Sequence, residues 1–236
     1  MVVVATKTNY VVYSMKKRAS RQTSNNVQKP NSQSLEKIVA KNEEQKEFIR
    51  AIVDNKIVFC TGTPGAGKSF LSMGIACEHL LRGDISNIIV TRPLVATGGK
   101  FPALPGTMDE KLDPYWLQMR CYADRFLGKA LATQMITDRT IQFFPMELMR
   151  GLSLDNTYLI CDEVQSISKE QLIMLLTRLG QNSKILLLGD PYQSDVKCPI
   201  LEQSMMKLEN IDDIGFCHLE KCLRPKIVSD IYNALR

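Results

Sequence analysis

The feature that most constrains the fold of this chain is the run Gly62-Thr63-Pro64-Gly65-Ala66-Gly67-Lys68-Ser69, which matches the pattern G-x-x-x-x-G-K-[ST]. An apolar stretch, Ile57–Cys60, precedes the run, and a helix of about four turns is predicted after it, from Gly67 to Arg82. Glycines let the main chain curl around a phosphate, and the N-terminal end of a helix attracts the same anion. The pattern therefore predicts a phosphate-binding loop between a buried strand and a helix.

Further apolar runs extend this alternation of strands and helices along the chain. The runs Ile88–Val90, Ile141–Phe144, Tyr158–Cys161 and Ile185–Leu188 are short and uninterrupted, as expected of strands that are buried on both faces. Residues 42–53 have apolar side chains at helical spacing and predict an amphipathic helix. Alternation of this kind favours a doubly wound α/β fold, in which helices cover both faces of a mostly parallel sheet.

Length and charge distribution indicate one domain with a basic leader. A chain of 236 residues has room for one α/β core but not for two. Residues 1–41 hold eight Lys or Arg against a single acidic residue, Glu36, and predict a mobile basic arm. This arm either contacts nucleic-acid phosphate or only keeps the protein soluble. Residues 42–236 form the predicted P-loop domain, with an insertion at about 94–134 that carries its own helix near Pro114–Leu127.

Composition argues against several other classes of protein. The seven cysteines are scattered, and no two are separated by only two residues, which argues against a zinc ribbon and a disulfide framework. No apolar stretch approaches the length of a membrane span, and the opening Met1–Ala5 is too short for the apolar region of a signal peptide. A cytoplasmic protein with reduced thiols and no membrane contact is expected.

Two carboxylates at a second strand end supply the metal and base chemistry that a triphosphate site needs. Asp162 and Glu163 directly follow a predicted strand, where an α/β sheet places its ligand crevice. Ser69 and Asp162 suit a Mg²⁺ site, and Lys68 suits the β and γ oxygens of the phosphate chain. Glu163 is placed to act as the general base on the attacking water. The alternative is that the acidic pair caps the helix after Ser168.

A third strand end and three arginines complete the set of candidates. Gly189–Asp195 contains Gln193, whose carboxamide can donate and accept hydrogen bonds at a γ-phosphate. An ordinary proline-containing turn is the alternative for this segment. Arg178 and Arg224 are candidates for a guanidinium at the γ-phosphate, and either could equally be a surface or helix-end residue. Arg92 directly follows a predicted strand and could contact phosphate or nucleic acid.

These residues resemble the PhoH-like family, the phosphate-starvation-inducible ATPases whose core is similar to that of superfamily 1 helicases. The resemblance covers about residues 42–235 and is specific, because many motifs match in order. The matching segments are the P-loop, Thr91-Arg92-Pro93, Leu104-Pro105-Gly106, Glu110-Lys111, Asp113-Pro114-Tyr115, Arg150-Gly151, Asp162-Glu163-Val164-Gln165, Leu176-Thr177-Arg178-Leu179-Gly180 and Gly189-Asp190-Pro191-Tyr192-Gln193-Ser194-Asp195. The resemblance implies a RecA-like P-loop NTPase fold with ATP and Mg²⁺ as cofactors.

The resemblance also implies roles for individual side chains. Gln45 would contact adenine, and Gln165 and Gln193 would respond to the γ-phosphate. Arg224 would be the arginine finger. The expected nucleotide contacts are Gln45, Gly62, Thr63, Pro64, Gly65, Ala66, Gly67, Lys68, Ser69, Phe70 and Gln165; the expected catalytic groups are Lys68, Glu163, Gln193 and Arg224; the expected metal ligands are Ser69 and Asp162.

The chain departs from the family pattern at two places. Val164 and Ser166 stand where Ala and Asn are usual after the acidic pair. Lys221-Cys222 precedes Leu223-Arg224 where an acidic residue and a valine are expected. The second departure lies directly beside the expected arginine finger.

The predicted function is Mg²⁺-dependent ATP hydrolysis coupled to the binding, remodelling or unwinding of RNA, or of DNA. A nucleoside kinase of the P-loop class and a non-catalytic nucleotide-dependent switch are the alternatives. Helicases of this type close two cores around ATP, and this chain has room for one. A homo-oligomer is therefore expected, for which the family suggests a hexamer, with Arg224 acting across the interface.

Overall fold

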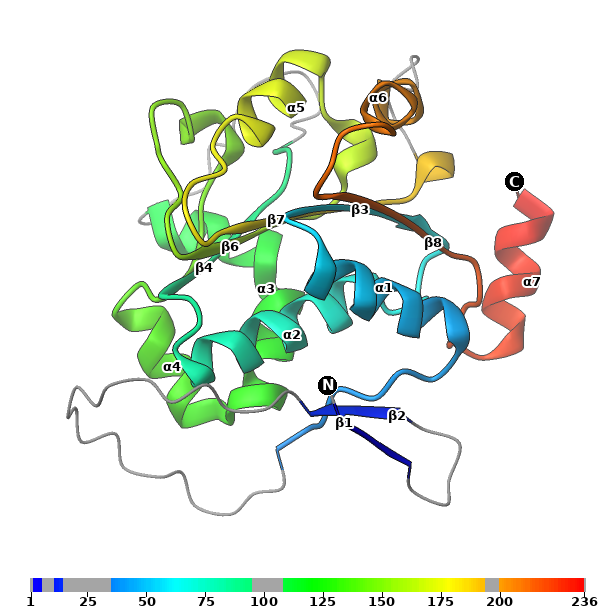
Figure 1. Cartoon of the computed structure of the whole chain (residues 1–236), viewed down its shortest axis with the longest axis horizontal. Helices are drawn as coiled ribbons and strands as arrows, with labels where there is room; N and C mark the ends of the chain where they lie inside the picture. Colours follow the sequence, from blue (N-terminus) through cyan, green and yellow to red (C-terminus); the bar gives the residue numbers. More distant parts are fainter. Residues whose placement is uncertain (1, 6–10, 15–34, 95–107, 194–199, 236) are drawn as a thin grey trace.

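The structure is a computed structural model that describes residues 2–5, 11–14, 35–94, 108–193 and 200–235. Its centre is a six-stranded sheet in the spatial order β5-β4-β6-β7-β3-β8, and all neighbouring strands are parallel (Figure 1). The strands are β3 (Ile57–Gly62), β4 (Asn87–Thr91), β5 (Ile141–Phe143), β6 (Thr157–Cys161), β7 (Lys184–Gly189) and β8 (Ile214–Leu219). The predicted parallel α/β fold is confirmed.

Helices cover both faces of this sheet, as Figure 1 shows. The helices α1 to α4 lie on one face, and α5 and α6 lie on the other. The helix α7 lies beside β8 at the edge of the sheet. The bounds are α1 (Glu43–Asp54), α2 (Lys68–Arg82), α3 (Met108–Leu127), α4 (Lys129–Thr137), α5 (Lys169–Leu176), α6 (Ile200–Leu208) and α7 (Lys226–Leu235), with the short 3₁₀ helices η1 (Met146–Leu148), η2 (Val164–Ser166) and η3 (Pro191–Gln193).

Strand β3 shows why both faces must be covered. Its side chains alternate between two apolar clusters: Val58 and Cys60 join the cluster under α1 to α4, and Ile57 and Phe59 join the cluster under α5 and α6. Phe59 is fully buried. Burial of one such side chain stabilises the fold by about 1.5–3 kcal/mol. The buried cysteines Cys60, Cys77 and Cys161 are free thiols that act as small apolar side chains, and burial raises the pKa of the Cys77 thiol to about 12.

Two elements differ from the sequence expectation. Strand β8 was not predicted, because Gly215 and His218 interrupt its apolar pattern and most of its residues are only half-buried. Helix α3 begins at Met108, six residues before the predicted start at Pro114, so this proline lies inside the helix. A proline there removes one helical hydrogen bond at a cost of about 3 kcal/mol. Burial of Leu112 and Trp116 on either side of Pro114 offsets that cost.

The segment 94–134, which was predicted as an insertion, contains most of the crossover from β4 to β5. Helix α3 packs against α2, and α3 and α4 contribute buried residues to the same cluster. The predicted arm at 1–41 contains two short antiparallel strands, β1 (Val2–Ala5) and β2 (Val11–Ser14). Residues 15–34, 95–107 and 194–199 lie outside the described residues. Residues 35–41 are joined to the domain, because Ala40 is buried in its core and the Glu36 N–H donates to the Arg125 carbonyl at 3.1 Å.

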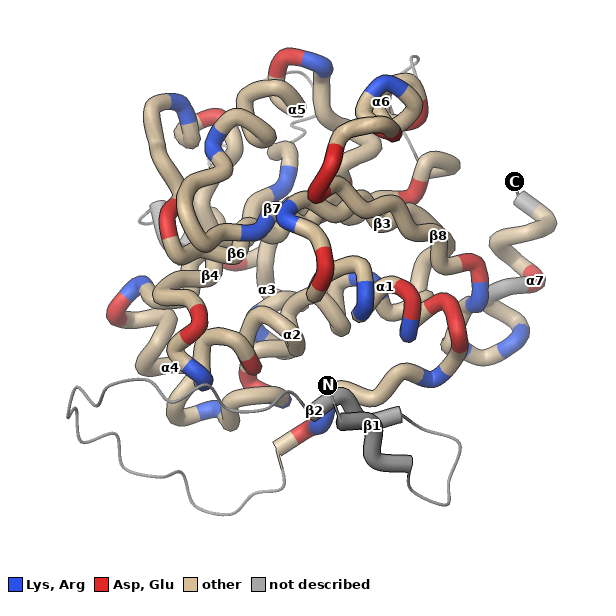
Figure 2. Tube along the Cα trace, viewed as in Figure 1, with Lys and Arg blue, Asp and Glu red and all other residues tan. Residues whose placement is uncertain are grey.

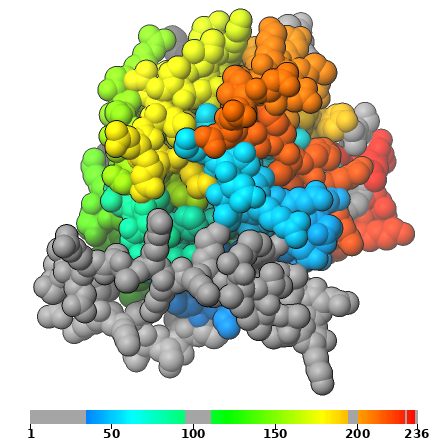
Figure 3. All heavy atoms as spheres, in the orientation of Figure 1, coloured from blue at the N-terminus to red at the C-terminus, as the bar shows by residue number. Residues whose placement is uncertain are grey.

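The N-terminal helix and the C-terminal part of the domain are neighbours. Lys56 pairs with Asp213 at 2.6 Å, and the Glu44 carboxylate accepts from the Glu220 N–H at 2.9 Å. Figure 3 shows the resulting continuous surface, where the blue and cyan residues meet the orange and red ones. Among the described helices, none has both the length and the apolar character needed to cross a membrane.

Candidate nucleotide-binding site

The P-loop lies at the carboxyl end of β3 and leads directly into α2. Gly65 and Gly67 have positive φ angles of 81° and 99°, in a region that suits glycine. The Lys68 ammonium reaches back over the loop and donates to the carbonyls of Gly62 at 2.6 Å and Thr63 at 3.0 Å. Burial lowers the pKa of Lys68, and the nearby thiol of Cys60 and carboxylate of Asp190 oppose this shift. The loop thus places a cation over a ring of main-chain atoms.

The first turn of α2 fits a bound anion. No main-chain hydrogen bond among the described residues uses the N–H groups of Gly65, Gly67 or Lys68. A Cβ at Gly67 would lie 2.7 Å from Nε2 of Gln45, so the loop is closely packed from behind. Free donors at a helix N-terminus and a glycine cradle are the features that a triphosphate requires. The residues present therefore fit the expected nucleotide.

Gln45 is buried beneath the loop, with 2% of its surface exposed. Its Nε2 donates to the Ala66 carbonyl at 2.7 Å, and its Oε1 accepts from the Lys41 N–H at 2.8 Å. The side chain was expected to contact adenine. In this structure both ends of its amide pair with the main chain, and the contact that it makes is with the P-loop itself.

A cavity of about 270 Å³ opens beside the loop and Gln45. Phe70 lines it, and the Phe70 ring contacts Tyr122 edge-on at 5.4 Å between ring centres. The Arg125 guanidinium lies 5.0 Å from the same ring. The sequence analysis did not assign Gln118, Tyr122 or Arg125 to a site, although Gln118 and Tyr122 have the spacing of one helix face. An aromatic and basic wall of this kind suits a nucleobase.

The acidic pair, Asp162 and Glu163, follows β6 and faces the P-loop at the carboxyl ends of the strands. The Ser69 hydroxyl lies 3.4 Å and 3.3 Å from the two carboxylate oxygens of Asp162. Burial and, to a smaller extent, the Glu163 charge raise the pKa of Asp162 to about 6, and Arg92 opposes both effects. A half-buried carboxylate that faces a hydroxyl fits the oxygen ligands that Mg²⁺ prefers. Ser69 and Asp162 would hold this ion.

Glu163 is held in an unusual conformation. Its φ of 59° and ψ of 38° lie in the left-handed region, which residues other than glycine rarely adopt. The Gln165 Nε2 donates to the Glu163 carboxylate at 2.6 Å, and the Gln165 Oε1 accepts from the Asp190 N–H at 3.0 Å. The acidic pair does not cap α5, which was the alternative role for it. Ser168 caps α5 instead, through a capping box with Gln171.

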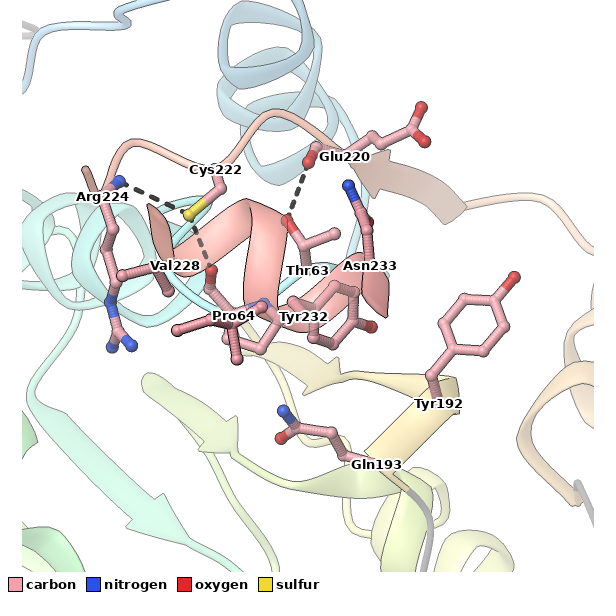
Figure 4. A pocket seen from close by; sticks show the side chains of 11 residues that line it. Thr63, Pro64, Tyr192, Gln193, Glu220, Cys222, Arg224, Val228, Tyr232 and Asn233 are labelled. Carbon is pink, nitrogen blue, oxygen red and sulfur yellow. Dashed lines mark hydrogen bonds between the residues drawn. The ribbon is translucent and has the colours of Figure 1, made fainter. Parts of the chain in front are cut away.

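A larger cavity of about 580 Å³ lies on the other side of the loop (Figure 4). It is lined from three segments: Thr63 and Pro64 of the P-loop, Gln193 after β7, and the chain from Glu220 into α7. Gln193 is exposed, and its segment forms the short helix η3. The structure therefore places Gln193 on the same cavity as Thr63.

Arg224 lies along its own P-loop. The Leu223 N–H donates to the Gly65 carbonyl at 3.1 Å, and a Cβ at Gly65 would lie 2.8 Å from Cγ of Arg224. The Cys222 thiol donates to the Pro64 carbonyl at 3.2 Å (Figure 4). Arg224 lines both cavities that flank the loop. Among the candidate arginines, this one is in contact with the P-loop of its own chain.

The other two arginines have different surroundings. Arg178 follows α5 and donates to the carbonyls of Leu152 at 3.0 Å and Met174 at 3.3 Å. It precedes β7, so it lies at the amino ends of the parallel strands, whereas the P-loop lies at their carboxyl ends. Arg92 donates to the Tyr115 carbonyl at 3.3 Å, and its buried Nε has no hydrogen-bond partner among the described residues. The structure brings Arg92 near Asp162 and does not bring Arg178 to the site.

Comparisons with known proteins agree with this geometry. Residues 37–236 match the model of a family described as PhoH-like protein. The PhoH-like protein of Mycobacterium tuberculosis is 35% identical over 195 residues, which cover 80% of this chain and 55% of that protein. Protein PhoH of Escherichia coli is 32% identical over 194 residues, which cover 79% of this chain and 55% of that protein. The chain spans about half the length of the curated relatives it matches.

Solved structures extend the comparison to the fold. The large terminase of a thermophilic bacteriophage matches with a TM-score of 0.52 at 12% identity, over 82% of this chain and 50% of that chain. The same terminase in complex with ADP matches with a TM-score of 0.51 at 12% identity, with the same coverage of both chains. At this identity the likeness shows the fold alone, which is a RecA-like P-loop fold.

Proposed function

The chain belongs to the PhoH-like protein family, and from this premise we propose that it is a Mg²⁺-dependent ATPase that acts on RNA, or alternatively on DNA. The observation that carries the proposal is the approach of the Ser69 hydroxyl to within 3.3–3.4 Å of Asp162, with Lys68 over the loop. Two separate segments, the P-loop and the end of β6, meet there with the groups that a bound triphosphate requires. The related terminase fold that was solved with ADP adds support for an adenine nucleotide.

The residues of the site divide the work of hydrolysis. Lys68 and the loop N–H groups would hold the β- and γ-phosphates. Ser69 and Asp162 would hold Mg²⁺, whose chemistry at this site would be to supply positive charge to the phosphate oxygens. Glu163 accepts a proton from the attacking water while the oxygen of that water bonds to the γ-phosphorus. The bond to the bridging oxygen breaks, and ADP leaves. Gln193 and Arg224, which line the larger cavity, contact the γ-phosphate.

Coupling to nucleic acid rests on the resemblance of the family to helicase cores and on the basic leader. The chain carries a formal net charge of +5. In the described part, Lys and Arg alternate with Asp and Glu over the helices (Figure 2). The concentration of positive charge in residues 1–41 is therefore the feature that suits phosphate backbone.

We also propose that copies of the chain assemble into a ring, for which a hexamer is the expected size. The larger cavity is open beside the P-loop, and α7 exposes Ile227 and Ile231 at 62% and 54% of their surfaces. Apolar side chains beside an open nucleotide site suit a neighbouring copy that closes it.

ATP turnover with and without single-stranded RNA or DNA tests the function. Replacement of the proposed base by Glu163→Gln keeps the shape of the side chain, so a fluorescent ATP analogue still binds while turnover falls by about 10²–10⁴-fold. Lys68→Ala loses binding itself. The matched control is Glu170→Gln at the exposed start of α5, which leaves turnover unchanged.

The outcomes separate the alternatives. Stimulation of turnover by RNA supports the motor, and transfer of phosphate to a nucleoside supports a kinase instead. Binding without turnover in the unmodified chain supports a switch. If Glu163→Gln hydrolyses ATP at the normal rate, Glu163 is not the base and the proposed mechanism is wrong.

A further inference from the structure

A tyrosine near the end of the described chain reaches the centre of the site. The Tyr232 hydroxyl, on α7, donates to the carboxylate of Asp190, with distances of 3.1 Å and 3.0 Å to its two oxygens. Asp190 directly follows β7 and is only 5% exposed. The Tyr192 N–H donates to the same carboxylate at 3.1 Å. A buried carboxylate needs such partners, so the position of Asp190 depends on the tyrosine hydroxyl.

Asp190 is joined in turn to the proposed base. Its N–H donates to Oε1 of Gln165 at 3.0 Å, and Nε2 of Gln165 donates to the Glu163 carboxylate at 2.6 Å. An amide can satisfy both partners in one orientation only, because one end accepts and the other donates. The amide also has little room to shift, since a Cβ at Gly189 would lie 2.7 Å from its Oε1.

Glu163 needs this support. Its left-handed main chain is costly for a residue other than glycine, by an amount on the order of 1–3 kcal/mol. Such a conformation persists where neighbours fix it, and Gln165 supplies a bond of 2.6 Å to the carboxylate. A change in the direction of the Gln165 amide therefore changes where the carboxylate points.

We infer that Tyr232 is a positioning residue for hydrolysis, because it holds Asp190, Asp190 holds Gln165, and Gln165 aims Glu163 at the attacking water. The inference rests on the function proposed above. Tyr232 lines the larger cavity together with Thr63 and Pro64, but its hydroxyl bonds to Asp190. The relay therefore predicts a larger effect on the rate of hydrolysis than on nucleotide binding. The relay makes the proposed base dependent on the placement of α7, a helix whose Ile227 and Ile231 are exposed.

Tyr232→Phe tests the relay, because it keeps the ring and removes only the hydroxyl. With one hydrogen bond to a charged group lost, kcat falls about tenfold while KM and the affinity for a fluorescent ATP analogue stay within about twofold. Affinity is measured separately because Asp190 also lies near Lys68. Circular dichroism and the melting temperature show that the variant is folded.

The matched control is Tyr158→Phe. This tyrosine is fully buried, whereas Tyr232 is half-buried, and its hydroxyl likewise pairs with a titratable side chain, His79 at 3.2 Å. It lies near the opposite end of β6 from the acidic pair. Its loss lowers the melting temperature and leaves kcat unchanged. If Tyr232→Phe behaves in the same way, the hydroxyl only anchors α7 and the relay is refuted.

A double-mutant cycle identifies the route. In a Gln165→Ala background the relay is already broken, so Tyr232→Phe causes no further loss of kcat. Independent, multiplicative losses would overturn the route through Gln165. The two failures are distinguishable: an unmodified chain without ATP turnover removes the proposed function, whereas an active chain with an unaffected Tyr232→Phe variant removes only the relay.

Discussion

Gly189 is the residue at which the addition of a single methyl group would disturb the side chains around the proposed base. A Cβ there would lie 2.7 Å from Oε1 of Gln165 and 2.8 Å from Cγ1 of Val164. Gly189→Ala should therefore displace the amide that holds Glu163. We expect kcat to fall at least about tenfold. Overpacking should also lower the free energy of unfolding by about 1–3 kcal/mol, measured by urea denaturation.

Gly83→Ala is the control for this change. Gly83 ends α2 with a φ of 74°, and a Cβ there would meet no atom within 4 Å. The cost is limited to backbone strain, roughly 1 kcal/mol, and turnover should not change. An unchanged kcat in Gly189→Ala would mean that the Gln165 amide tolerates displacement.

Residues with a local pattern were predictable from the sequence, and residues that act through distant contacts were not. Lys68 and Ser69 follow a fixed spacing, and Asp162 follows an apolar strand, so each is visible in a short window. The bond from Tyr232 to Asp190 joins positions 42 residues apart and exists only because α7 lies beside the sheet. No window of sequence contains that information.

At the scale of elements, α2 is joined to β6 through a titratable pair. The ring nitrogen Nδ1 of His79 lies 3.2 Å from the Tyr158 hydroxyl. Burial lowers the pKa of His79, Asp84 opposes the shift, and Lys184 adds to it. Because the folded pKa lies below the unfolded value of about 6.5, the unfolded chain binds more protons in acid. This contribution to stability is complete well above about pH 6.5 and is lost as the pH falls through the folded pKa.

In the variant His79→Gln, the glutamine can still pair with the Tyr158 hydroxyl but cannot titrate. The free energy of unfolding should fall less between about pH 7.5 and pH 5 in this variant than in the unmodified chain. Asp162 has a raised pKa and acts in the opposite direction, but it is present in both proteins. The comparison therefore isolates His79, and equal pH dependence in the two would contradict the assignment.

The central strands that the sequence predicted correctly are those with buried apolar side chains along most of their length. Strands β3, β6 and β7 are apolar throughout most of their length because helices cover both of their faces. Strand β8 at the sheet edge lacks that signal, and the start of α3 was misplaced because Pro114 is typical of a helix boundary. In both cases the structure is fixed by packing against apolar residues elsewhere in the chain, which a short stretch of sequence does not show.

At the scale of the whole molecule, Arg224 can act at the nucleotide site of its own chain or at that of a neighbouring copy. Chain length led to the expectation that Arg224 acts across an interface. The fold instead lays Arg224 over Gly65 of the same chain, through the path of the chain from β8. Chain length limits the number of ATPase cores in one chain, but it does not show which P-loop Arg224 contacts.

Mixing two inactive variants decides between these arrangements. Lys68→Ala keeps the arginine and loses the nucleotide, and Arg224→Ala keeps the nucleotide and loses the arginine. If Arg224 serves its own chain, as its contact with Gly65 favours, neither variant repairs the other and turnover of the mixture equals the sum of its parts. Sedimentation of labelled chains shows whether mixed assemblies formed. Recovery of turnover in mixed assemblies would place the arginine of one copy at the phosphate of the next.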